Sequence, residues 1–561
     1  MRMLLIALGA LLWMVLPVRA DEYYVAPDGA DTNPGTLDAP FASVERGQEA
    51  AKPGDTVYLR GGEYHFSGTQ QSIGIALSKS GASGSPIKYF AYEGEQPILD
   101  LFELKPQARV TGIDIRANWL HLRGIEVRGV RQLIVGDSWG VRIRGDHNVV
   151  EHFNVHDNEA PGIFITSGAS NLVLNCDSHH NYDPLENGGN ADGFGCHAEG
   201  GDNVMRGCRA YENSDDGFDF INAAGSCMAE QSWSFRNGYI PDTDTTAANG
   251  AGFKSGGYGN PPRTPATGAA RHAIRGSLAF ANRAIGFYAN YHPGGIDFFN
   301  NTAYDNPANF DMRTGGGATT THKLRNNVAL MPGRDIVSWA GGSDETSTWK
   351  LGISVSARDF AGVDKAEALA PRQADGSLPQ VSFLRLADGS QLIDRGEDVG
   401  MPFTGSAPDL GAYEWGAEPT SNAGAGGSAA AGAGAAGLGG TGAAGVPGGA
   451  AMGGASGAAG AAGTPLTAAG SAAAGSGWPI VPAGGAAAGA TSVAPTAAGA
   501  GAAAGPTAGN AAPAAAVSGG SSTSDGCSCA TVRGRAGPPW PCALLLTLLA
   551  LTRFARRGRL G

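Results

Sequence analysis

The chain has 561 residues and a formal net charge of −12, but no charged residue lies between Glu418 and Asp525. Eight of the arginines lie outside residues 21–418, two before this segment and six after it, whereas only one acid, Asp525, lies outside it. Residues 21–418 therefore carry a net charge of −19. A body this acidic, without a basic stripe, excludes a nucleic-acid partner and suits the capture of cations. None of the seven cysteines forms a CxxC pair, so we expect no zinc site.

The first 20 residues form the first predicted segment. They combine an early Arg2 with an apolar run and end in the small residue Ala20. This pattern predicts a secretory signal peptide over residues 1–20, cleaved before Asp21. The mature protein is therefore expected to be exported, into a setting in which disulfides can form.

A repeat of eleven residues recurs between residues 148 and 306. Its six copies end at Asn158, Asn181, Asn213, Asn237, Asn282 and Asn306. Six recurrences at one phase predict that these side chains stack as an asparagine ladder at a turn between coils. Positions six and eight of each copy are expected to point inward on one strand. Position six holds Phe153, Cys176, Cys208, Ser232, Ser277 and Asn301.

A second strand is predicted after each of these asparagines. Its segments include GFGCH (193–197), GFDFI (217–221) and GFKSG (252–256), each with phenylalanine in second position. This alternation places an aromatic row inside, and short strands at a fixed phase predict a stack of coils. We therefore expect residues 21–418 to form an all-β domain with the parallel β-helix fold, and to be monomeric.

Cys176 and Cys208 occupy the same phase in successive coils. Because neighbouring strands lie ~4.8 Å apart, the two side chains could be stacked buried thiols or a disulfide between coils. We favour the disulfide.

The outward face of the second strand carries a cluster of acids. Its third position holds Phe164, Gly195, Asp219, Lys254, Tyr288 and Asp311 in successive coils. Asp192 and Asp216 precede two of these strands, and Asp215 lies beside them. Aspartate next to glycine also favours turns, but four carboxylates in one patch repel unless a cation neutralises them. Oxygen ligands in an exported protein predict a Ca²⁺ site at Asp192, Asp215, Asp216 and Asp219.

Lys254 lies one coil beyond Asp219, which suggests proton abstraction. A bound cation at a uronate carboxylate would lower the barrier to removing the neighbouring C5 proton. Lysine is a base only when neutral, so its pKa must fall from ~10.4, and a nearby divalent cation favours that fall. β-Elimination across C4–C5 would then cleave the polymer, with activity favoured at alkaline pH.

Residues 419–525 are rich in Gly, Ala, Pro, Ser and Thr. This composition predicts a flexible linker, because it cannot bury enough apolar surface to fold. Residues 526–561 contain Cys527 and Cys529, and then a short apolar run that is followed by Arg553, Arg556, Arg557 and Arg559. They resemble a MYXO-CTERM sorting tail, in which the cysteine motif is the processing and attachment point. The alternative is a plain tail anchor; both predict attachment to a membrane or cell surface.

Residues 21–417 resemble family 9 polysaccharide lyases, which are right-handed parallel β-helix pectate lyases. The resemblance depends on the segments ADGFGCH, NSDDGFDF and GFKSGG, with weaker support from residues 23–64 and the closing SAPDLGAYE. It implies that four aspartates, here Asp192, Asp215, Asp216 and Asp219, bind calcium and that Lys254 is the base. The implied partner is an acidic polysaccharide, pectate or polygalacturonate.

Other residues on the same face have weaker predicted roles. Arg313 could hold a substrate carboxylate, and Tyr288 could stack on a sugar. His197 and Glu199 flank the aspartates, where a structural role is the simpler expectation.

Three alternative functions remain open on sequence alone. A polygalacturonase-like hydrolase would use aspartates as acid and base and would need neither Ca²⁺ nor Lys254. A lyase could act on another uronate polymer, such as alginate. A surface β-helix that binds glycans without catalysis would suit the linker and tail equally well.

Overall fold

The computed structural model describes residues 20–417, apart from residue 107 and the segments 136–137, 260–267, 314–320, 331–333 and 338–341. The predicted signal peptide up to residue 19, the linker, and the tail with Cys527 and Cys529 lie outside the described residues. In the described part of the chain, no helix combines the length and the apolar character needed to span a bilayer.

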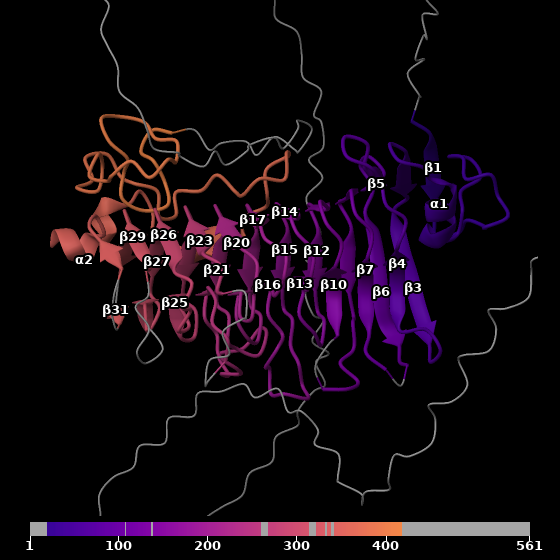
Figure 1. The fold of residues 1–561 in the computed structure, drawn as a ribbon, viewed down its shortest axis with the longest axis horizontal. Helices are drawn as coiled ribbons and strands as arrows, with labels where there is room; N and C mark the ends of the chain where they lie inside the picture. Colours follow the sequence, from indigo (N-terminus) through magenta and orange to yellow (C-terminus); the bar gives the residue numbers. More distant parts are fainter. Residues whose placement is uncertain are drawn as a thin grey trace, which may run out of the picture. The chain divides into compact units, whose positions relative to one another are not determined.

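The chain winds through three parallel sheets, and each full coil contributes one strand to each sheet (Figure 1). Sheet 1 contains β1 (Glu22–Val25), β2 (Thr56–Leu59), β5 (Ile87–Ala91), β8 (Leu120–Arg123), β11 (Val149–Glu151), β14 (Leu172–Leu174), β17 (Asn203–Arg206), β20 (Cys227–Glu230), β23 (His272–Arg275), β26 (Ile296–Phe299), β29 (Lys323–Arg325) and β32 (Ser343–Asp344).

Sheets 2 and 3 follow sheet 1 in each coil. Sheet 2 contains β3 (Gly62–Gly68), β6 (Pro97–Leu104), β9 (Glu126–Arg128), β12 (Asn154–His156), β15 (Asp177–His179), β18 (Arg209–Tyr211), β21 (Trp233–Phe235), β24 (Leu278–Phe280), β27 (Thr302–Tyr304) and β30 (Val328–Leu330). Sheet 3 contains β4 (Ile73–Leu77), β7 (Thr111–Ile115), β10 (Trp139–Ile143), β13 (Ile163–Ile165), β16 (Phe194–Cys196), β19 (Phe218–Asp219), β22 (Phe253–Lys254), β25 (Ile285–Tyr288), β28 (Ala308–Asp311) and β31 (Arg334–Val337).

The parallel β-helix is thus confirmed, and so is the asparagine ladder. Each ladder side chain donates its amide Nδ2 to the Oδ1 of the next, at 3.0 Å from Asn158 to Asn181 and 2.8 Å from Asn181 to Asn213. The series continues through Asn237 and Asn282 to Asn306. These bonds satisfy buried amides at the corner between sheets 2 and 3, where unpaired polar groups would be costly.

The predicted aromatic row is also present inside the coils. Rings of Phe194, Phe218, Phe253, Phe287 and Phe310 stack in sequence, with centroids 4.6–5.1 Å apart. A glycine precedes the first four of these rings, and at Gly217 an added Cβ would lie 2.0 Å from Ser234 Oγ and 2.8 Å from the Asn237 amide. Glycine therefore lets sheet 3 start close against the ladder.

The expectation for position six is wrong in one respect. Phe153, Cys176 and their equivalents are buried, but they lie at the corner between sheets 1 and 2, not within a strand. The residue before each of them has a positive φ, as at His152 (54°) and Asn175 (53°), so the chain turns there. Later coils use this corner for a second ladder, in which backbone amides donate to Ser232, Ser277, Asn301 and Asn327.

The predicted disulfide between Cys176 and Cys208 is also wrong, because both are free, buried thiols. Side chains of equal phase in successive coils run parallel, whereas a disulfide needs its Cβ atoms to converge to ~3.8 Å. The disulfide instead joins Cys196 and Cys227, whose Cα atoms lie 6.4 Å apart. Cys196 ends β16 in sheet 3 and Cys227 begins β20 in sheet 1, so the bond joins two different sheets and two different coils.

The remaining elements lie before and after the coils. Helix α1 (Val44–Ala50) packs near the N-terminal strands, and α2 (Thr348–Leu351) follows the last strand. Residues beyond it, including the 3₁₀ helices η1 (Ala357–Asp359) and η2 (Lys365–Leu369), return over the outer face of sheet 2. They form a second apolar cluster there that includes Trp233, Phe280, Phe383 and Leu410.

Candidate active site

The outward row on sheet 3 has the predicted register. Asp219 pairs with Gly195 on one side and with Lys254 on the other, and Lys254 pairs with Tyr288. Because equal positions of neighbouring strands meet in a parallel sheet, residues 35 apart in the chain become neighbours on one face.

Three of the four predicted ligands meet on this face. Asp192, Asp216 and Asp219 each offer a carboxylate oxygen within 4.8 Å of the others. Their positions are held by the backbone, since Asp192 Oδ1 accepts from the Asp216 amide at 2.9 Å and Asp216 Oδ1 accepts from the Ala251 amide at 2.6 Å. All three side chains belong to buried residues, so little water screens their charges.

Asp215 lies beside this group and has different contacts. Its Oδ1 accepts from the Asn249 amide at 2.9 Å, and its Oδ2 accepts from the Asn190 amide at 3.0 Å. Asp215 therefore ties together the two long loops that precede β16 and β22. Each oxygen retains a lone pair, so these contacts leave coordination open.

Lys254 completes the cluster. Its Nζ lies 3.1 Å from Asp216 Oδ2 and 3.1 Å from Asp219 Oδ2. The residue is only 8% exposed, so the ammonium contacts the acids with little solvent between them.

The electrostatics of the cluster favour an additional cation. Burial and repulsion from the neighbouring acids raise the pKa of Asp192 well above its usual value, and burial raises that of Asp216 to about 7. Burial alone lowers the pKa of Lys254, but the surrounding aspartates outweigh it and raise that pKa well above its ordinary value. One lysine thus faces several carboxylates, and buried acids with no counter-charge take up protons.

The donor set fits a hard divalent cation. Asp216 Oδ2 is buried and lies 3.1 Å from the Lys254 ammonium, but no described residue donates a hydrogen bond to it, so it can accept a ligand bond. Carboxylate oxygens from three or four aspartates are the ligands that Ca²⁺ prefers. Asp192, Asp216 and Asp219 would hold the ion, and Asp215 is close enough to influence it.

His197 is a member of the site to which sequence reasoning gave little weight. Its Nε2 lies 3.9 Å from Asp219 Oδ2, and its ring meets Phe164 edge-on at 5.0 Å. Burial lowers its pKa, which favours the neutral imidazole, and Nε2 lacks a hydrogen-bond partner among the described residues. The signal was its phase, two residues after outward Gly195. Glu199, by contrast, is exposed.

The two predicted substrate-binding residues lie on the C-terminal side of Lys254. The Arg313 Nε donates to Asp311 Oδ2 at 2.8 Å, and its guanidinium lies 5.7 Å from the Tyr288 ring centroid and 5.9 Å from that of Tyr291. Asp311 therefore fixes the side chain of Arg313, which is about one-third exposed.

A parallel β-helix with a lysine set against clustered aspartates on one sheet defines a class of polysaccharide-degrading protein. Residues 23–327 match the family described as Pel9A-like, right-handed β-helix region, and the chain belongs to this family, polysaccharide lyase family 9. It is a polysaccharide lyase with a pectate lyase-like function.

Individual relatives support that assignment over nearly their whole length. The chain is 37% identical over 400 residues to pectate lyase L of Dickeya chrysanthemi, covering 70% of this chain and 90% of that one. The crystal structure of pectate lyase Pel9A has a TM-score of 0.61 at 33% identity, covering 70% of this chain and 96% of that chain. A rhamnogalacturonan lyase structure matches with a TM-score of 0.61 at 34% identity, covering 66% and 97%.

Proposed function

We propose that this protein is a calcium-dependent lyase that cleaves (1→4)-α-D-galacturonan, the polymer of pectate, by β-elimination. The observation that carries the proposal is the position of Lys254 Nζ, 3.1 Å from both Asp216 and Asp219 on one face of sheet 3. The pectate lyase relatives support the substrate class.

Asp192, Asp216 and Asp219, with Asp215 beside them, are proposed to hold Ca²⁺. When bound, the ion would neutralise a uronate carboxylate and stabilise the charge that develops beside C5. A uronate held there would have its C5 close to the lysine, because the aspartates and Lys254 project from neighbouring coils.

Lys254 is proposed as the base. Its pKa is raised by the aspartates, and once their charge is matched by a cation, burial remains as the dominant influence and favours the neutral amine. Nζ then takes the C5 proton, the C5–H electron pair forms the C4=C5 double bond, and the C4–O bond breaks. The leaving oxygen takes a proton from water, which gives one unsaturated sugar end per cleavage.

Rhamnogalacturonan is a second candidate substrate. A rhamnogalacturonan lyase matches this chain at the same TM-score as pectate lyase Pel9A, and its name implies galacturonate units as well. The proposed chemistry needs a uronate at the cleavage site but leaves the neighbouring sugar open. A hydrolase is disfavoured, because acid–base hydrolysis would not require a lysine among the carboxylates.

The test follows ultraviolet absorbance of unsaturated products from polygalacturonate and from rhamnogalacturonan, with calcium and with EDTA. We expect absorbance to rise with polygalacturonate and calcium, to stop with EDTA and to stop in Lys254→Ala. Lys323→Ala, on the exposed side of sheet 1, is the matched control and should retain activity. Reducing ends without absorbance would instead indicate a hydrolase, and no product on any uronan would indicate a glycan-binding protein.

We also propose export through residues 1–20 and surface attachment through residues 526–561, with Cys527 and Cys529 as the processing motif. The sequence patterns of these segments support this proposal. Cell fractionation tests this proposal, because deletion of residues 526–561 should move the protein from the cell envelope to the medium. Light scattering of the released protein should show a monomer. Retention in the envelope would contradict attachment through the tail.

A further inference from the structure

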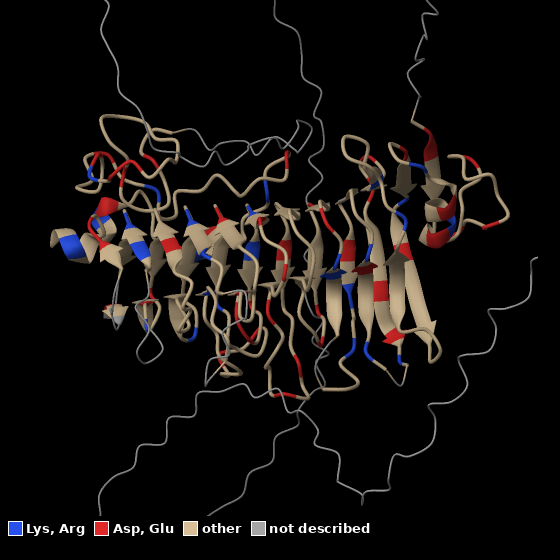
Figure 2. Cartoon of the chain, viewed as in Figure 1, with Lys and Arg blue, Asp and Glu red and all other residues tan. Residues whose placement is uncertain are grey.

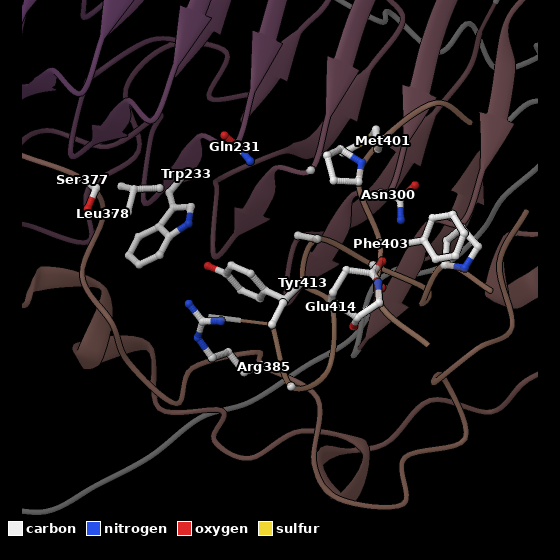
Figure 3. Close-up of a pocket in the computed structure, with 18 of the residues that line it drawn as sticks. Gln231, Trp233, Asn300, Ser377, Leu378, Arg385, Met401, Phe403, Tyr413 and Glu414 are labelled. Atoms are coloured by element: carbon white, nitrogen blue, oxygen red, sulfur yellow. The ribbon is translucent and has the colours of Figure 1, made fainter. Parts of the chain in front are cut away.

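A cavity of about 460 Å³ lies where the C-terminal segment crosses the corner between sheets 1 and 2 (Figure 3). Its floor consists of Gln231, Gly276 and Asn300, which occupy equivalent turn positions in three successive coils. Its volume falls in the range of ~300–1,000 Å³ that is typical of small-molecule sites. The acid cluster is on sheet 3, so this cavity belongs to a different face of the β-helix.

Aromatic side chains form part of the wall. The Trp233 side chain hydrogen-bonds to Tyr413, and Phe403 is 41% exposed. Figure 3 shows Trp233 and Arg385 toward one side of the cavity, Met401 and Phe403 toward the other, and the Gln231 amide facing inward between them. Aromatic surface with a few polar groups is the usual lining of a ligand site.

Arg385 supplies a positive charge to this cavity. Its guanidinium stacks on the Tyr413 ring at 4.6 Å, and its Nε donates to the Val381 carbonyl at 3.1 Å. Across the described residues, no carboxylate lies within 4.0 Å of it. Stacking and the Nε bond fix the plane of the group, and its two terminal nitrogens remain for a ligand.

A second cation lies next to the first cavity. An adjoining hollow of about 270 Å³ shares Gln231, Met401 and Pro402 and is also lined by Arg206, Glu230 and Arg275. Arg206 pairs with Glu230, but Arg275 lies over Phe299 at 5.5 Å, and its buried Nε lacks a partner in the described part of the chain. Basic residues recur on these strands of sheet 1 (Figure 2).

We propose that these two adjoining cavities together bind an acidic oligosaccharide without a metal ion. One uronate carboxylate pairs with Arg385 and another with Arg275, and a sugar ring lies against Tyr413. Arginine pairs with carboxylates through two parallel hydrogen bonds, and a neutral sugar would leave both guanidinium groups without a counter-charge. The ligand class rests on the proposed function, because it is that of the substrate and product of the lyase.

The experiment measures binding of trigalacturonate to the full chain by calorimetry. Lys254→Ala is included to prevent turnover, and the titration is run with calcium and with EDTA. We expect two sites with calcium and one with EDTA, since only the sheet 3 site requires the ion. Arg385→Gln and Arg275→Gln should each weaken the EDTA-resistant site by about tenfold or more, as expected for a charged hydrogen-bonding partner.

Two controls make the result specific. Arg123→Gln removes another sheet 1 arginine, which stacks on Phe90 at 4.1 Å away from the cavity, and it should leave EDTA-resistant binding unchanged. Fully methyl-esterified trigalacturonate should bind at least tenfold more weakly than the acid. The proposal is overturned if no EDTA-resistant site exists, if both arginine variants bind normally, or if the ester binds equally well.

The two proposals fail in distinguishable ways. Loss of turnover on all uronans with EDTA-resistant binding intact would remove the lyase function and leave the second site. Normal calcium-dependent turnover without EDTA-resistant binding would remove only the second site.

Discussion

Lys254 Nζ lies 3.1 Å from Asp219 Oδ2, although 35 residues separate the two in the chain. The parallel register of β19 and β22 produces this contact, because it pairs the two residues directly. The loop between these strands is free to vary in length, since the register depends on the asparagine ladder and the phenylalanine row. The placement of an amine beside an acid is thus a property of the stacked coils.

We expect Lys254→Ala to lose ~10²–10⁴-fold in kcat, which is the contribution that general base catalysis typically makes. Lys254→Arg should be nearly as inactive, since arginine stays protonated. Initial rates of absorbance change on polygalacturonate measure both. Calcium binding by calorimetry is the control and should persist in Lys254→Ala; turnover near the wild-type rate in either variant would show that another group is the base.

Calcium should stabilise the folded protein through the acid cluster. An ion that binds only the native state at 100 times its Kd adds ~2.7 kcal/mol to the free energy of unfolding. Thermal unfolding with and without calcium measures the shift in Tm, which should shrink in Asp216→Asn. Asp297→Asn, on sheet 1, is the matched control. An equal Tm shift in Asp216→Asn and wild type would place the ion elsewhere.

Acid should destabilise the fold through two buried histidines. Burial lowers the pKa of His292 and of His322 to about 4, below the ordinary value of ~6.5. The unfolded chain therefore binds protons first as pH falls. Stability from these groups is complete above pH ~6.5 and is lost between ~6.5 and ~4, by up to about 3 kcal/mol for each histidine.

His322→Phe tests this acid sensitivity, because neither ring nitrogen of His322 has a hydrogen-bond partner among the described residues. An apolar ring of similar size should leave stability at pH 7 within about 1 kcal/mol and flatten the decline toward pH 4. Denaturant unfolding at several pH values gives the slopes. His65→Phe, at an exposed position, should not change them; an unchanged slope in His322→Phe would argue against its lowered pKa.

The Cys196–Cys227 disulfide should stabilise the coil that carries the acids. The loop that it closes spans 31 residues and contains Asp215, Asp216 and Asp219. Replacing both cysteines with alanine should cost about 3–4 kcal/mol of the free energy of unfolding, from loop-closure entropy. Denaturant unfolding checks the value. Cys176→Ala, which removes one free thiol, is the control. Its loss in the free energy of unfolding should be the same with and without reductant.

Peptide-level alkylation checks the cysteine pairing itself. Cys176 and Cys208 should react only after unfolding, because both thiols are buried, and Cys196 and Cys227 only after reduction. A disulfide-linked peptide that contains Cys176 and Cys208 would contradict the pairing seen in the structure.

Much of the fold was predictable, because residues that contact each other in successive coils of a β-helix occupy equivalent positions of a sequence repeat. Asn158 and Asn181 occupy one phase, and so do Phe194 and Phe218; each contact is between equivalent positions. The same logic placed Asp219 next to Lys254, since register converts equal phase into proximity.

The sequence by itself determined which residues recur at one phase, and hence the ladder, the aromatic row and the acid cluster. Only the tertiary structure decided that Cys196 pairs with Cys227, that Asp215 binds loop amides, and that the C-terminal segment encloses a cavity with Arg385. Those contacts join residues at different positions of the repeat, or residues in loops that do not repeat. Their geometry depends on how the chain turns at each corner and packs back on the coils, and no local periodicity encodes that path.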